Sequence, residues 1–97
     1  MTGAPSSLNR AFAQALRQAR KAHKLTQEDF STASGRTYIS ALERGLKSPT
    51  LEKIAGLAAT INIHPLTLLT LTFMHARGGL TIEQLWTQVE RELKKLR

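Results

Sequence analysis

The chain has 97 residues, enough for one small domain and too few for a second domain or a large ligand cavity. Lys and Arg number 14 against 7 Asp and Glu, and the net charge of +7 favours a polyanionic partner, either nucleic acid or an anionic membrane. The absence of cysteine excludes disulfide scaffolds, thiolate zinc sites and thiol catalysis, and it fits the reducing conditions of a cytoplasmic protein.

The first part of the chain predicts a short tail followed by a basic amphipathic helix. Residues 1–7 are polar and lack the basic-then-apolar pattern of a signal peptide, so we expect a flexible tail. Over residues 8–24 apolar side chains recur every three or four positions, with Ser6 or Ser7 as the N-cap. This stripe consists of Leu8, Ala11, Phe12, Ala15, Leu16 and Ala19.

Two short helices joined by a tight turn are predicted next. Thr26 is a suitable N-cap for a helix of at most two turns over residues 26–33. After a turn at Ser34-Gly35, a second helix begins near Arg36 and ends at Gly45, which is suited to a left-handed C-cap. Two helices connected in this way form a helix-turn-helix.

Residues 51–75 predict two further helices separated by a break. Thr50 caps the first, over residues 51–60, and Pro65 begins the second, which reaches about His75 and is apolar almost all round. Residues 54–76 contain no charged side chain and approach the length of a membrane span, but Pro65 indicates a break between two buried helices. The core stripe of the first helix is Leu51, Ile54, Ala55, Leu57 and Ala58.

A hinge at Gly78-Gly79 precedes a last amphipathic helix, which Thr81 and Gln84 cap in a capping-box pattern. The apolar stripe of this helix is Ile82, Leu85, Trp86, Val89, Leu93 and Leu96. The sequence therefore predicts an all-α fold of five helices plus a C-terminal amphipathic helix. Its expected organisation is a tail over residues 1–7, a helix-turn-helix domain over residues 8–76, and a C-terminal helix over residues 77–97 for packing or dimerisation.

Three segments taken together carry a family resemblance. They are Leu25-Thr26-Gln27-Glu28-Asp29-Phe30, Arg36-Thr37-Tyr38-Ile39-Ser40-Ala41-Leu42-Glu43-Arg44-Gly45 and Ser48-Pro49-Thr50-Leu51. Over residues 8–70 the chain resembles the phage repressor/Cro (XRE) family of helix-turn-helix regulators, and its Arg-Thr-Tyr-Ile-Ser segment is particularly similar to controller proteins of restriction–modification systems. The segment around Ala33-Ser34-Gly35 is shorter than is usual in the family, which affects the tilt of the recognition helix.

The resemblance implies a five-helix repressor-like domain whose recognition helix, beginning at Arg36, enters the major groove of double-stranded DNA. Arg36 is suited to guanine O6 and N7, and the Thr37 methyl group to a thymine methyl. Ser40 and Ala41 are small enough to let the helix lie deep in the groove, where Ala41 would touch a thymine methyl. The alternatives are a phosphate contact or ion pair for Arg36, a plain N-terminal turn position for Thr37, and helix packing for Ser40 and Ala41.

The remaining contacts are expected to reach the sugar-phosphate backbone and to orient the protein. They are assigned to Gln27, Tyr38, Arg44, Lys47, Ser48 and Thr50. Gln27 would bind a phosphate and brace the start of the recognition helix, unless it is an ordinary exposed glutamine. The Tyr38 hydroxyl either reaches a phosphate or packs into the domain. Glu43 would repel DNA, so we expect it to pair with Arg17 or Arg20.

One copy of such a domain reads half a site, so the resemblance implies a homodimer on a palindromic operator, with recognition helices about 34 Å apart. The dimerisation residues are expected to come from the helix that Pro65 begins and from the last helix. They are Leu66, Leu69, Phe73, Leu85, Trp86 and Val89. The alternative is that the last helix packs onto its own domain.

Together with the resemblance, these features predict a sequence-specific, double-stranded DNA-binding transcription regulator that needs no cofactor, and the resemblance implies a bacterial or phage origin. An enzyme is disfavoured because His23, His64 and His75 are scattered, with no metal-ligand spacing, nucleophilic set or phosphate loop. A second hypothesis keeps the fold but makes it an adaptor for another protein, for example an antitoxin. RNA binding is disfavoured because the aromatic residues lie mostly on core stripes.

Overall fold

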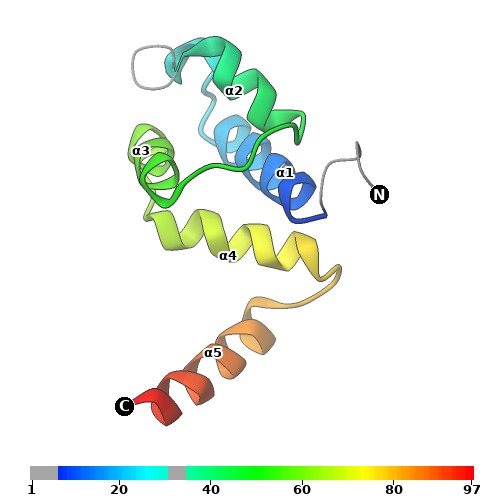
Figure 1. Ribbon diagram of the computed structural model, residues 1–97, viewed down its shortest axis with the longest axis vertical. Coiled ribbons are helices and arrows are strands. Elements are labelled where there is room, and N and C mark those ends of the chain that lie inside the picture. The colour runs from blue at the N-terminus through cyan, green and yellow to red at the C-terminus, as the bar shows by residue number, and fades with distance from the viewer. Residues whose placement is uncertain (1–6, 31–34) are drawn as a thin grey trace.

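The computed structural model describes residues 7–30 and 35–97. Its elements are α1 (Ser7–Ala22), the single 3₁₀ turn η1 (Gln27–Phe30), α2 (Arg36–Glu43), α3 (Leu51–Ile61), α4 (Pro65–Ala76) and α5 (Ile82–Leu96). The described part of the chain contains helices and turns and no strand, which confirms the all-α prediction. Figure 1 shows α1 to α4 gathered into one body, from which α5 projects at the end opposite α2.

The core lies between α1, η1, α2, α3 and α4. Helix α1 packs mainly against α4 and also against α2, so the hydrophobic stripe predicted for α1 faces inward. Helix α5 contributes no buried residue. The core consists of Phe12, Ala15, Leu16, Ala19, Phe30, Ile39, Leu42, Ile54, Leu57, Ile61 and Leu68.

The predicted helix boundaries at α3, α4 and α5 are confirmed by their caps. The Thr50 side chain accepts a hydrogen bond from the Lys53 backbone N–H at 3.1 Å, and Pro65 occupies the first turn of α4. Thr81 and Gln84 form both hydrogen bonds of a capping box, at 3.1 and 3.0 Å. These bonds satisfy backbone N–H groups that the first turn of a helix leaves unpaired.

The first helix ends earlier than predicted, at Ala22 instead of Lys24. Lys24 takes a left-handed φ of 57°, and the following Leu25 N–H donates to the Arg20 carbonyl at 3.0 Å. The left-handed residue closes the helix in the manner usually provided by glycine, and the periodicity of the side chains does not reveal this. Ser6, one of the two predicted N-caps, lies outside the described residues.

The helix predicted over residues 26–33 is described only as the 3₁₀ turn η1, since residues 31–34 lie outside the described part of the chain. The role predicted for Thr26 as a side-chain cap is wrong. The Asp29 carboxylate accepts the hydrogen bond from the Thr26 backbone N–H at 2.7 Å, and the Thr26 hydroxyl donates to the same carboxylate at 3.2 Å. The acidic residue three positions on therefore closes this turn.

Three residues predicted for core stripes are exposed instead. Leu8 is 47% exposed at the start of α1 and Leu51 is 76% exposed at the start of α3, while Ala55 is also exposed. The buried row of α3 consists of Ile54, Leu57, Ala58 and Ile61. At 3.6 residues per turn, Leu51 and Ala55 lie to one side of that row, so the stripe is shifted from its predicted centre.

The break predicted at Pro65 is confirmed, because α3 and α4 are bent by 106° relative to one another. Within residues 7–30 and 35–97, no single helix is long and apolar enough to cross a membrane, and only this bent pair reaches the required length and composition together.

Candidate nucleic-acid interface

Helix α2 has one buried side and one side open to solvent. Ile39 and Leu42 are completely buried and hold the helix against the core. At 3.6 residues per turn, the opposite side presents a set of polar residues, which we call the α2 outer face. It consists of Arg36, Thr37, Ser40 and Arg44, of which Ser40 is half-buried and the other three are exposed. The structure thus brings three of the four predicted base-reading residues together.

The fourth, Ala41, is a correction. Ala41 is only 7% exposed, so the methyl group expected to touch a thymine is packed inside the domain. Its carbonyl accepts the hydrogen bond from the Leu46 N–H that closes the end of α2, at 3.0 Å. The alternative assignment of Ala41 to helix packing is the one that the structure supports.

Arg36 is held over the start of α2 by a carboxylate of η1. Its Nη1 lies 3.6 Å from Oε2 of Glu28, and the two side chains are 68% and 71% exposed. Pairs this exposed contribute about 0–1 kcal/mol, so Glu28 orients the guanidinium in the free protein without preventing an exchange of partners. The ion pair that was one alternative for Arg36 is therefore present.

The buried side of α2 ends in an ionic network around Glu43, which is 3% exposed. Arg20 on α1 donates to both Glu43 carboxylate oxygens, from Nε at 2.6 Å and from Nη2 at 2.9 Å. This hydrogen bonding raises the pKa of Arg20 above its ordinary value. Arg17 adds a hydrogen bond from Nη2 to the Glu43 carbonyl at 2.7 Å. The predicted structural role of Glu43 is confirmed, and both predicted arginines reach it.

Gln27 belongs to the same network. Its Nε2 donates to Glu43 Oε1 at 3.1 Å, so the half-buried Gln27 braces the end of α2. The prediction had placed this contact at the start of the helix. The Glu43 carboxylate on α2 accepts hydrogen bonds from Arg20 on α1 and from Gln27 on η1. One buried acceptor thereby fixes the position of α2 relative to both α1 and η1.

The Tyr38 side chain extends from α2 toward Lys53 in the first turn of α3. The half-buried ring packs against the core, which supports the packing alternative. The ammonium groups of Lys47 and Lys53 lie 5.9 and 5.2 Å from the ring centroid, within the range of cation–π attraction. Two positive charges are thus gathered beside α2, near the loop that follows it.

Lys53 was missed by the sequence analysis although it bears a recognisable signal. A cation in the first turn of a helix opposes the helix dipole, which favours acids at that end. Lys53 therefore gains nothing from the helix dipole, and its ammonium lies over the same Tyr38 ring as that of Lys47 in the preceding loop.

The loop after α2 exposes most of its polar side chains. Lys47, Ser48 and Thr50 are all exposed. The Thr50 hydroxyl oxygen accepts the capping hydrogen bond, and its hydrogen is still able to donate to another group. Arg44 Nε makes one long hydrogen bond of 3.4 Å to the Ser40 carbonyl at the edge of the α2 outer face. Lys47 and Lys53 thus meet at the Tyr38 ring of α2, and the exposed Ser48 and Thr50 lie between them in the chain.

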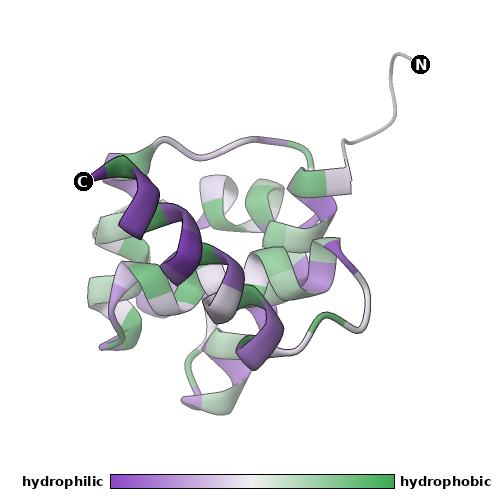
Figure 2. Ribbon diagram, turned by 90° about the horizontal axis from the view of Figure 1, so that it is seen from below, coloured by the Kyte–Doolittle hydropathy of each residue, from purple (hydrophilic) through white to green (hydrophobic). Residues whose placement is uncertain are grey.

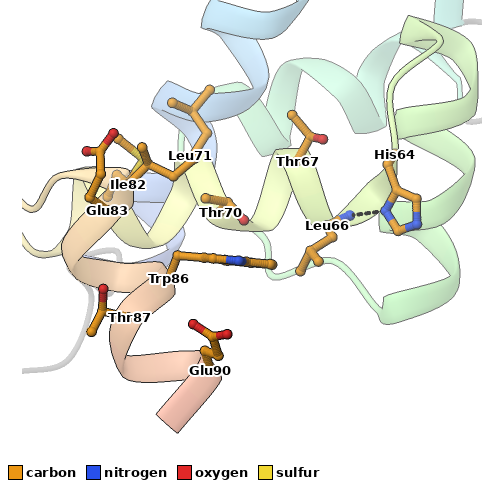
Figure 3. Close-up of a pocket in the computed structure, with 11 residues that line it drawn as sticks. His64, Leu66, Thr67, Thr70, Leu71, Ile82, Glu83, Trp86, Thr87 and Glu90 are labelled. Carbon is orange, nitrogen blue, oxygen red and sulfur yellow. Dashed lines mark hydrogen bonds between the residues drawn. The ribbon is translucent and has the colours of Figure 1, made fainter. Parts of the chain in front are cut away.

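The predicted dimerisation residues are divided by the structure. Leu66 on α4 and Trp86 on α5 line one groove between the two helices, and Figure 3 shows the Trp86 indole extending from α5 toward Leu66. Leu69 packs against the core, and Phe73, 43% exposed, lies outside that groove. Leu85 and Val89 are half-buried on α5. Helix α5 touches α4 but buries none of its own residues.

Comparison with known proteins gives one match. A family model described as helix-turn-helix matches residues 16–68, more than half of the chain. Searches of curated proteins and of solved structures found no significant match. The matched span contains the C-terminal part of α1, all of η1, α2 and α3, and the start of α4, and so includes the whole α2 outer face. The chain belongs to the helix-turn-helix family of the phage repressor/Cro (XRE) type, a family of DNA-binding transcription regulators.

Proposed function

We propose that the protein reads a specific double-stranded DNA sequence by placing the α2 outer face in the major groove. The observation that carries this proposal is the combination of three exposed polar residues and the half-buried Ser40 on one side of α2 with an ionic network that fixes the other side. A rigid helix with an exposed polar face is what direct readout of base edges requires. Arg36 exchanges Glu28 for guanine O6 and N7, while Thr37 and Ser40 contact neighbouring bases.

Backbone contacts come from both sides of this helix. Lys47, Ser48 and Thr50 reach phosphates from the loop, with Lys53 added to the set because it shares the Tyr38 ring with Lys47. Gln27, Tyr38 and Arg44 are the other residues that we propose contact the sugar-phosphate backbone. Residues 1–49 carry eight basic and three acidic side chains, and this excess of positive charge in the half that holds α2 suits a polyanion.

We further propose that the protein acts in the cytoplasm, as a homodimer on a palindromic operator. A single recognition helix buries too little surface for high affinity, and a two-fold dimer doubles the contacts on an inverted repeat. Figure 1 supports the arrangement, because α5 lies at the end of the molecule opposite α2 and leaves the α2 outer face uncovered.

Replacing Arg36 with alanine is expected to cost about 1–3 kcal/mol of discrimination at one base pair of the site. The loss arises because the guanidinium fork donates to two guanine acceptors at once. Arg36→Lys is the matched control: it keeps the charge, so the salt dependence is retained while discrimination is lost. Affinities for single-base variants of the site check this. Uniform weakening on every duplex by both variants would contradict base reading by Arg36.

Replacing Lys47 or Lys53 with alanine is expected to weaken binding evenly across sequences. Each lost phosphate contact flattens the slope of log affinity against log salt by about 0.9. Lys95→Ala, on α5 far from α2, is the control and should leave the slope unchanged. Titrations at several salt concentrations measure the effect. A changed base preference, or an unchanged slope for both loop variants, would overturn the backbone assignment.

A further inference from the structure

Helix α5 carries an apolar seam that its own domain does not cover. Ile82, Trp86, Val89, Leu93 and Leu96 follow one another in steps of four and three residues, the spacing at which two helices pack seam to seam. Trp86 is 48% exposed, Leu93 58% and Leu96 81%. Figure 2 looks onto α5 from below and shows hydrophobic and hydrophilic residues alternating along it. An exposed seam of this kind indicates a partner helix.

Beside the seam, α4 and α5 enclose an open groove of about 800 Å³. Its walls are mostly apolar, with Leu71 and Met74 from α4 and Ile82 and Trp86 from α5. Figure 3 shows Leu71, Ile82 and Trp86 among the residues that line it. The charged side chains among its lining residues are two acids, Glu83 and Glu90, and Glu90 already lies 3.9 Å from the ammonium of Lys94 on the same helix. In a chain with a net charge of +7, this acidic rim disfavours DNA and calls for an apolar occupant with basic flanks.

The C-terminal half of α5 has these properties. Leu93 and Leu96 are its apolar residues, and at 3.6 residues per turn Lys94 and Arg97 flank them on the side of the helix that bears Glu83. It cannot occupy the groove of its own copy, because it continues the helix that forms one wall. A second copy of the chain supplies the same segment without this restriction.

We propose that the groove between α4 and α5 receives the C-terminal half of α5 from a second copy, so that the two α5 helices pair in antiparallel orientation. Ile82 then packs on Leu93 of the partner subunit, and Glu83 faces Lys94 of the partner subunit. The two-fold axis repeats each contact, which closes the assembly as a dimer. This arrangement rests on the proposed function for its dimer and adds the exchanged segment and its direction.

The position of the groove selects the antiparallel direction. On α5 the groove is lined by residues between Ile82 and Glu90, in the N-terminal part of the helix. A segment from the C-terminal half of a second α5 lies beside them only when the two helices run in opposite directions. In that direction the side of the seam that bears Glu83 meets the side of the partner helix that carries Lys94 and Arg97.

Charge reversal tests the contact. Glu83→Lys alone and Lys94→Glu alone should each weaken self-association about tenfold, because both copies then place like charges at the rim. An equimolar mixture should recover the wild-type association as a heterodimer. Lys95→Glu, on the far side of α5, is the control and should behave as wild type. Sedimentation equilibrium measures all four samples, and a mixture no tighter than its components would overturn the proposal.

Cross-linking tests the direction, and it is free of background because the chain contains no cysteine. Ile82→Cys and Leu93→Cys, one of them bearing a tag, should form a mixed disulfide when combined and little of either homodimer. Self-cross-linking of each variant would indicate a parallel pair and contradict the proposal, as would monomers alone or association with an unrelated protein only. Duplex selection with the same variants is independent of this result, so a wrong helix pairing is distinguishable from a failure to read DNA.

Discussion

Replacing Arg20 with methionine is expected to lower the free energy of unfolding by about 3–5 kcal/mol, because it leaves the Glu43 carboxylate buried without its main partner. The Arg20 side chain is 11% exposed and that of Glu43 is 4% exposed, so water replaces little of the lost pairing. Loss of the bidentate contact also frees the end of α2 from α1. We therefore expect denaturant unfolding to show the loss and DNA binding to weaken in parallel.

Two controls identify the cause of that loss. Arg17→Met removes a side chain that is 48% exposed and lies 4.0 Å from the Glu43 carboxylate, and it should cost less than about 1.5 kcal/mol. The double variant Arg20→Met with Glu43→Leu should recover a large part of the loss, since no buried charge is then left unpaired. If the double variant is less stable than Arg20→Met alone, the penalty does not come from the stranded carboxylate.

Replacing Phe30 with alanine is expected to cost about 3–5 kcal/mol, the range for truncating a large buried aromatic side chain. Phe30 is completely buried and is the only buried residue of η1, so this one ring ties the turn to the core beneath α2. Leu46→Ala is the matched control, because Leu46 is 56% exposed and its truncation should cost under about 1 kcal/mol. Equal losses for the two variants, measured by denaturant unfolding, would mean that Phe30 does not anchor η1.

Much of the fold could be predicted because its signals are local. Thr50, Pro65 and Thr81 act within three residues of themselves, through a cap or a fixed φ, and the structure confirms each boundary. The pairing of Glu43 with an arginine of α1 was also foreseeable, since a carboxylate on a DNA-binding helix must be neutralised elsewhere. Local chemistry of this kind leaves little choice to the rest of the chain.

The remaining differences depend on how neighbouring elements meet. Ala41 has the same size whether it faces a groove or a core, and only the packing of α2 determines which side it occupies. The position of Gln27 opposite Glu43 follows from how closely η1 approaches the end of α2, a distance that spacing along the chain does not define. Lys53 differs, because its place in the first turn of a helix was visible in the sequence.

In the proposed dimer the two ends of the molecule have separate tasks. The longest dimension of the chain is 41 Å, with α2 near one end and α5 near the other. Pairing through α5 therefore leaves the α2 outer face of each copy open. Two recognition helices bind one face of a duplex together only when their separation is a whole number of helical turns, so the spacing of half-sites reports the geometry of the dimer.

Selection of bound duplexes from a random pool tests most directly whether α2 reads base pairs. We expect an enriched inverted repeat whose half-site centres are separated by a whole number of turns of about 10–10.5 base pairs. We also expect affinity for it to fall about 10³- to 10⁵-fold between about 50 and 200 mM salt. A bound pool with no sequence enriched over the starting pool would contradict the proposal that the α2 outer face recognises DNA sequence.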